Sequence, residues 1–163
     1  MFTESTNCRS CHNSYSLNSG SGSISLSGLP SSYTPGQTYD LSIIFSGTSL
    51  NSYGFQLAAQ ANMNTSGTLS AVSSDMSIDA SAAEHRGASS SGIWNFQWTA
   101  PATDEGSVSF YAVGVAGNGG GSSGDYVYTA SENLSAAAAE SISVEWNAST
   151  GGVIFSSPTI GSN

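Results

Sequence analysis

The chain has very few basic residues and no lysine. Arg9 and Arg86 are its 2 basic residues against 11 acidic ones, so the formal net charge is −9 over 163 residues. Binding to a phosphate backbone requires clustered cations, and this composition therefore excludes nucleic acid as a partner. No apolar run approaches the roughly 18 to 20 residues that a membrane-spanning helix needs, so we expect no membrane span.

Charge of either sign is scarce, because charged residues make up only 8% of the chain. Hydrophobic residues make up 38%, which is enough for one core and argues against a disordered chain. The polar remainder is mostly serine, glycine, threonine and asparagine, which hold water through hydroxyls and amides. We therefore expect an extracellular or cell-surface protein, exported with its signal peptide removed, and possible sugar acceptors are Asn64, Asn133 and Asn147.

Apolar and polar residues alternate with period two from residue 23 onward, which is typical of half-buried strands. In Ile93–Trp98 the alternation places Trp94, Phe96 and Trp98 on one face, which we expect to lie in the core. Roughly eight or nine such segments with turn residues between them predict an all-β, antiparallel immunoglobulin-like β-sandwich. Residues 73–91 are polar and irregular, and we expect a long loop there that crosses between the sheets.

The first residues are polar and hold both cysteines, in the run Cys8-Arg9-Ser10-Cys11-His12. C-x-x-C-H is the attachment motif of c-type haem, because two thiols three residues apart reach the two vinyl groups of one porphyrin and the adjacent imidazole then coordinates the iron. We therefore expect one covalent haem c, with Cys8 and Cys11 as attachment points and His12 as proximal ligand. The expected division is a haem-attachment arm over 1–22 and a sandwich over 23–131. Residues 132–163 would add strands to the same domain or to a neighbouring subunit.

Three other uses of the cysteines remain open. A thioredoxin-like motif would follow a strand and open a helix, a context that this polar arm lacks. A structural zinc site needs four ligands, and the sequence offers only His85 beyond the motif, without the spacing of a zinc finger. A disulfide between Cys8 and Cys11 is the third alternative.

The second axial ligand of a haem iron would come from His85, Met63 or Met76. We expect His85, which lies in the polar segment before the tryptophan strand. Two histidine ligands leave no open position on the iron and no general base elsewhere, so we expect no enzymatic activity.

The chain resembles the Reeler domain of bacterial and archaeal secreted proteins that carry a haem motif. The resemblance runs from Cys8 to Ser131, and its motifs are the C-x-x-C-H run, 28–30, 33–39, 53–57, 94–101, 108–112 and 124–128. It implies an immunoglobulin-like sandwich and a recurring histidine at the position of His85. Related domains stand beside redox modules, which implies an electron-transfer setting.

Together these features favour a mono-haem c-type cytochrome for extracellular electron transfer, ligated by His12 and His85. Its partners would be redox proteins or copies of itself, joined head to tail into a filament by strand addition. The alternative is a structural or adhesive surface module with a Cys8–Cys11 disulfide and no haem. A third reading is a haem sensor or peroxidase-like protein in which His85 is not a ligand.

Overall fold

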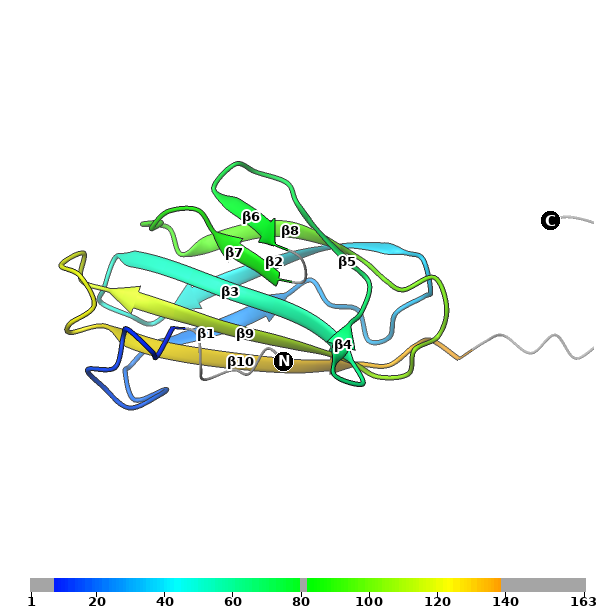
Figure 1. The fold of residues 1–163 in the computed structure, drawn as a ribbon, viewed down its shortest axis with the longest axis horizontal. Helices are drawn as coiled ribbons and strands as arrows, with labels where there is room; N and C mark the ends of the chain where they lie inside the picture. Colours follow the sequence, from blue (N-terminus) through cyan, green and yellow to red (C-terminus); the bar gives the residue numbers. More distant parts are fainter. Residues whose placement is uncertain (1–7, 80–81, 139–163) are drawn as a thin grey trace, which may run out of the picture.

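Ten strands and no helix form the described part of the chain, residues 8–79 and 82–138, in the computed structural model (Figure 1). None of these residues therefore forms a helix that could cross a membrane. The strands are β1 (Ser23–Ser27), β2 (Thr38–Ser46), β3 (Ser52–Ala61), β4 (Asn64–Thr65), β5 (Thr68–Ala71), β6 (Met76–Asp79), β7 (Ala82–His85), β8 (Ile93–Thr99), β9 (Val108–Gly117) and β10 (Tyr126–Leu134).

The strands form two antiparallel sheets. One has four strands in the order β1-β2-β8-β5, and the other runs β10-β9-β3-β7-β6, with β4 paired to β3. The longest strands, β3 and β9, are neighbours in the second sheet and pair from Ser52↔Gly117 to Gln60↔Ser109. The expected all-β antiparallel sandwich is confirmed.

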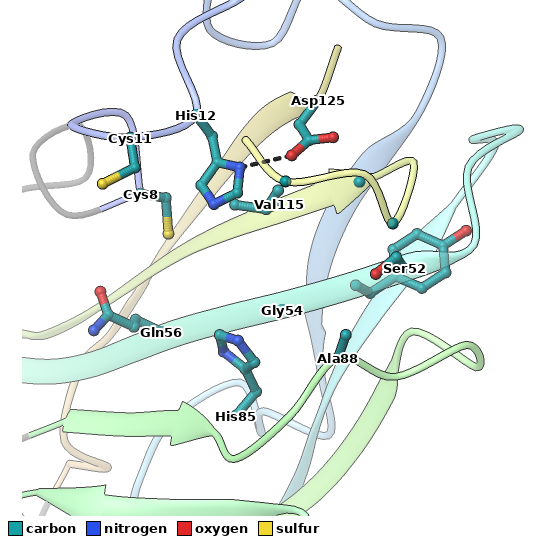
Figure 2. A pocket seen from close by; sticks show the side chains of 14 residues that line it. Cys8, Cys11, His12, Ser52, Gly54, Gln56, His85, Ala88, Val115 and Asp125 are labelled. Carbon is teal, nitrogen blue, oxygen red and sulfur yellow. Dashed lines mark hydrogen bonds and ion pairs between the residues drawn. The ribbon is translucent and has the colours of Figure 1, made fainter. Parts of the chain in front are cut away.

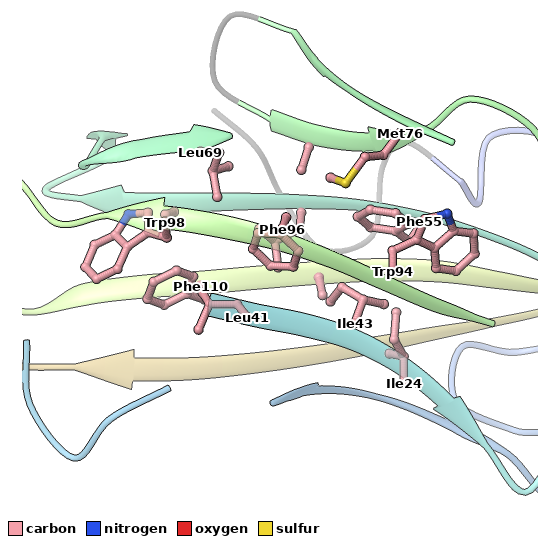
Figure 3. Packing of buried hydrophobic residues seen from close by; sticks show 14 of the residues in the cluster. Ile24, Leu41, Ile43, Phe55, Leu69, Met76, Trp94, Phe96, Trp98 and Phe110 are labelled. Atoms are coloured by element: carbon pink, nitrogen blue, oxygen red, sulfur yellow. The ribbon is translucent and has the colours of Figure 1, made fainter. Parts of the chain in front are cut away.

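The core lies between the sheets because the alternating residues of β2 and β8 point the same way. Trp94, Phe96 and Trp98 are each at most 1% exposed, as expected from the sequence (Figure 3). Leu41 and Ile43 of β2 pair with Phe96 and Trp94 in register and complete this face. Each buried aromatic side chain removes roughly 150–250 Å² from water, so these residues dominate the hydrophobic stabilisation.

The expected long loop over 73–91 is wrong, because β6 and β7 lie within it. These strands extend the six-stranded sheet beyond β3, with Gln56↔Glu84 and Leu57↔Ala83 in register. Each is only four residues long, and only Met76 and Ala83 are buried. Short strands of small and polar residues carry no period-two pattern, and their stability comes instead from backbone pairing of β7 with β3 and of β6 with β7.

Strand β10 continues past Ser131, where the sequence placed a boundary. It pairs with β9 through Leu134↔Val108, and Leu134 is buried. Beyond it, Ala136 forms a parallel bridge with Tyr33. Most of the segment expected to add strands, residues 139–163, and the acceptor Asn147 lie outside the described residues.

The N-terminal segment 8–22 is docked on the six-stranded sheet. Cys8 and Leu17 pack against a small apolar cluster of Val113, Val115 and Val127 from β9 and β10. Asn18 adds main-chain contacts with the outer edge of β10: its N–H donates to the Val127 carbonyl at 2.9 Å, and its side-chain oxygen accepts from the Thr129 N–H at 2.9 Å. The arm is thereby held to the end of the sandwich where β9 stops.

Candidate ligand pocket between the arm and the sandwich

A cavity of about 440 Å³ lies between the N-terminal arm and the six-stranded sheet (Figure 2). Cofactor pockets have volumes of roughly 300–1,000 Å³, so this one is large enough for an organic ligand. The arm contributes Cys8, Cys11 and His12, and the sandwich contributes His85. The structure thus brings all four expected site residues to one cavity, although 73 residues separate the two histidines in the sequence. The remaining walls are β3 from Ser52 to Gln56, Ala88, Val115, Asp125 and the glycines 117, 119 and 121.

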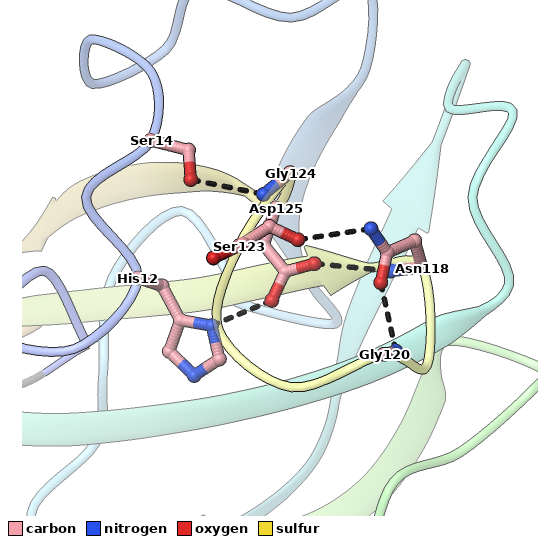
Figure 4. A network of polar contacts seen from close by, with 7 residues as sticks. All are labelled: His12, Ser14, Asn118, Gly120, Ser123, Gly124 and Asp125. Carbon is pink, nitrogen blue, oxygen red and sulfur yellow. Dashed lines mark hydrogen bonds and ion pairs between the residues drawn. The ribbon is translucent and has the colours of Figure 1, made fainter.

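His12 is held by a buried carboxylate. Its Nδ1 lies 2.7 Å from Oδ2 of Asp125, which is only 1% exposed (Figure 4). The other carboxylate oxygen of Asp125 accepts the Asn118 N–H at 3.0 Å. With Nδ1 engaged, the second ring nitrogen of His12 points away from Asp125 toward β3 and His85 (Figure 2).

His85 ends β7 and lies across the cavity from His12. The β3–β7 register stops at Gln56↔Glu84. At the next residue of β7, the His85 imidazole contacts the backbone of β3 in place of a main-chain partner. Its Nδ1 lies 3.0 Å from both the N and the O of Phe55. When Nδ1 carries the ring proton and donates it to the Phe55 carbonyl, Nε2 keeps its lone pair, which is the form that binds a metal.

Gly54 makes the position of His85 feasible. A Cβ at residue 54 would lie 2.5 Å from Nε2 and 2.7 Å from Cε1 of His85, closer than real Cβ atoms approach other atoms. The missing side chain therefore leaves room for the imidazole on the surface of β3. The ring also lies edge-on to Trp94, with centroids 6.5 Å apart, so the core fixes it from the other side.

The two cysteines lie on one tight turn, in which the Cys11 and His12 N–H groups both donate to the Cys8 carbonyl, at 3.3 and 2.9 Å. Both are free thiols in the structure. Burial, with a smaller contribution from Cys11, raises the pKa of the Cys8 thiol to about 11. Cys8 is therefore protonated at neutral pH and is a poor nucleophile for forming a disulfide.

The methionines considered as ligands lie away from this cavity. Met76 is 3% exposed and belongs to the core between the sheets (Figure 3). Met63 is 70% exposed in the turn that follows β3. Neither lines the pocket, and nowhere in 8–79 or 82–138 do three or more His, Cys, Asp or Glu side chains gather as a structural zinc site requires.

Sequence reasoning missed Asp125, Gly54 and Gln56 as pocket residues. Asp125 follows the glycine-rich loop of residues 117–124, where an aspartate is typical of a turn, and it does stabilise this loop by accepting the Asn118 N–H. Nothing in the local sequence connects it with His12, which is 113 residues away. Only the pairing of β9 with β10 brings the end of the loop under the arm.

Two of the solved structures with a similar fold are of F-spondin. The human F-spondin reeler domain is 18% identical, with a TM-score of 0.59, and the match covers 75% of this chain and 94% of that one. The reelin-N domain of F-spondin is 17% identical, with a TM-score of 0.60 and coverage of 80% and 96%. At such identities the likeness shows the fold alone. No curated protein matches the sequence.

The Reeler domain family model matches residues 6–118, more than half of the chain. This match corrects the expected class: the assignment to electron-transport cytochromes is wrong, because the family model and the fold both identify a Reeler module. The resemblance to the Reeler domain is confirmed by the family model. The chain belongs to the Reeler domain family.

Proposed function

We propose that this chain is an extracellular structural or adhesive module, with no catalytic role, that binds hydroxyl-rich polymers at the cell surface. The Reeler match over residues 6–118 carries the proposal. The solved structures with a similar fold include reeler domains of F-spondin. The net charge of −9 with 2 basic residues favours neutral partners over acidic ones.

The outer face of the four-stranded sheet supports a binding role. It carries hydroxyl, amide and carboxylate side chains that bridge β2 and β8 in a row, with donor–acceptor distances between 2.7 and 2.9 Å. Such groups have further lone pairs and protons for a partner rich in hydroxyls. The bridges are Thr38–Thr99, Ser42–Asn95 and Asp40–Gln97.

A retention assay tests this role. Beads coated with the chain are passed over a surface of neutral polysaccharide, and the force that releases them is measured. We expect retention for the natural chain and severalfold weaker retention for Asn95→Glu, which adds a second negative charge to the row beside that of Asp40. Asn133→Glu on β10 is the matched control and should behave like the natural chain. Absence of retention, or equal loss in both variants, would overturn the proposal.

A second proposal concerns the pocket, and it is favoured by one observation: two thiols and two imidazoles line the same cavity. We propose that this Reeler module carries a covalent haem c, with Cys8 and Cys11 as attachment points and His12 and His85 as axial ligands. Each S–H would add across one vinyl C=C, with sulfur bonding one carbon and hydrogen the other, so no oxidant is consumed. Held by His12 and His85, such a haem would supply an iron that is not open to a substrate.

The residues present fit this group. Both thiols are free and lie on one turn, as the addition requires. Nδ1 of His12 is engaged by Asp125, and when Nδ1 of His85 donates to the Phe55 carbonyl instead of accepting the Phe55 N–H, the Nε2 atom of each ring is left for a metal. Between the two histidines, Gly54 and Val115 line the pocket without a polar side chain.

Absorption spectra test the haem. The chain is produced in a host that matures c-type haem, and spectra of oxidised and dithionite-reduced protein are compared with its intact mass. We expect a covalent haem with a sharp low-spin α band, and a high-spin spectrum for His85→Ala. The control Met63→Ala should leave the band unchanged. A chain with two unmodified thiols and no haem absorbance would overturn this second proposal and leave the first one standing.

A further inference from the structure

Asp125 is the one buried carboxylate among the described residues, and no Arg or Lys neutralises it. Its two oxygens accept from the His12 ring and from the Asn118 backbone. Desolvating a carboxylate costs several kcal/mol unless it is paired, so such a residue is retained where its partner depends on it. The partner here is an imidazole that lines the pocket.

We propose that Asp125 is a positioning residue that fixes the tautomer of His12 and aims its Nε2 lone pair into the pocket. A neutral imidazole has one proton, and a carboxylate can only accept, so the proton resides on Nδ1. Nε2 is then the free ligand nitrogen, made more electron-rich by the carboxylate behind it. The role of Asp125 in positioning a ligand nitrogen rests on the proposed haem site. The His12 tautomer depends only on the contact with Asp125 and forms without haem.

The surrounding hydrogen bonds fix the orientation of the His12 ring. Asn118 closes the glycine-rich loop onto itself, through the Gly120 N–H at 2.8 Å and the Ser123 carbonyl at 2.9 Å (Figure 4). The Gly124 N–H donates to the Ser14 hydroxyl at 2.9 Å, which ties this loop to the arm that carries His12. Both ends of the His12–Asp125 contact are therefore held by the same small network.

The first test uses the haem-free chain. Long-range ¹H–¹⁵N spectra distinguish the two tautomers, recorded at a pH above the titration of the His12 ring. We expect His12 in the Nδ1–H form in the natural chain and in the Nε2–H form in Asp125→Asn, because an amide N–H facing Nδ1 makes that atom an acceptor. An Nε2–H tautomer in the natural chain would overturn the inference even if Asp125→Asn failed to fold.

The second test measures affinity with ferric protoporphyrin as the probe. In a Cys8→Ser, Cys11→Ser background, which binds without covalent attachment, we expect Asp125→Asn to weaken binding by roughly 10- to 100-fold, the usual effect of removing such a partner. Asp40→Asn removes one negative charge from the opposite sheet and should leave binding unchanged. Equal affinity in Asp125→Asn and the parent would overturn the positioning role. Failure of the parent to bind, with the expected tautomer present, would instead count against the haem site alone.

Discussion

Trp94 and Trp98 lie four residues apart on the same face of β8, yet only Trp98 has a hydrogen-bond partner. The Trp98 Nε1–H donates to the Ser66 carbonyl at 3.0 Å, whereas Nε1 of Trp94 is buried without a partner. Both side chains are at most 1% exposed. The pair therefore separates the contribution of a buried hydrogen bond from the contribution of a buried ring.

Replacing each of these tryptophans by phenylalanine should have unequal effects on the free energy of unfolding. Trp98→Phe leaves the Ser66 carbonyl without its donor, whereas Trp94→Phe removes a donor that has no acceptor. Since an unsatisfied buried polar group costs about 1–3 kcal/mol, we expect Trp98→Phe to be more destabilising by about that amount. Urea unfolding of both variants measures the difference, and equal losses would contradict it.

Gly54→Ala should displace His85 without unfolding the chain. The added methyl would lie 2.5 Å from the His85 Nε2, and the ring is the end of a side chain that can rotate away. We expect about 1–3 kcal/mol of destabilisation, as for other overpacked sites, and altered NMR signals of the His85 ring.

Gly87→Ala is the matched control for that variant. A Cβ at residue 87 has no atom within 4 Å, so we expect a change within about 0.5 kcal/mol and unchanged His85 signals. Unmoved His85 signals in Gly54→Ala would show that the imidazole does not occupy the space over β3.

The haem-free chain should lose stability as the pH rises from 9 toward 11. The unfolded chain releases the Cys8 proton near the ordinary pKa of 9.0, whereas burial keeps it on the folded chain up to a pKa of about 11. Deprotonation therefore favours the unfolded state across this range. The measurement is the midpoint of thermal unfolding against pH, in which Cys8→Ser should show a smaller decline. The same shift predicts that iodoacetamide alkylates exposed Cys11 before Cys8 at pH 8.

Asn18 should be more sensitive to alanine than to glycine. Its φ is +57°, a conformation that costs an ordinary L-residue roughly 1–2 kcal/mol and glycine almost nothing. Both variants lose the contacts of the Asn18 side chain with Thr129. We therefore expect Asn18→Ala to destabilise the docked arm more than Asn18→Gly does, by about 1 kcal/mol. Hydrogen exchange of the residue-18 amide, whose N–H can still donate to the Val127 carbonyl in both variants, measures this, and a reversed order would refute the account.

The fold could be predicted from the sequence where large apolar residues alternate. The run around Trp94 and Trp98 predicts its strand and its buried face because large apolar residues, which must be buried, alternate there with residues that can face water. The pair β6 and β7 could not be predicted in this way, since Ala82 and Glu84 carry no hydrophobic period. The conformation of β7 depends on β3, which ends more than 20 residues earlier in the chain, and that of β6 depends on β7.

The candidate site likewise has a part that could be predicted from local sequence and a part that depends on the tertiary structure. Cys8, Cys11 and His12 form a local motif, so their proximity follows from spacing alone. That His85 faces them depends on the end of β7, and that Asp125 supports His12 depends on the β9–β10 pairing. Such relations are tertiary, and no window of the sequence contains both members.

The docking of Asn18 on β10 has a consequence for solubility. An outermost strand exposes unpaired N–H and C=O groups that attract strands of other molecules. At Val127 and Thr129 these groups are occupied by the arm. The segment that bears the cysteines therefore also shields this edge from aggregation, and a chain whose arm has come loose would expose pocket and edge together.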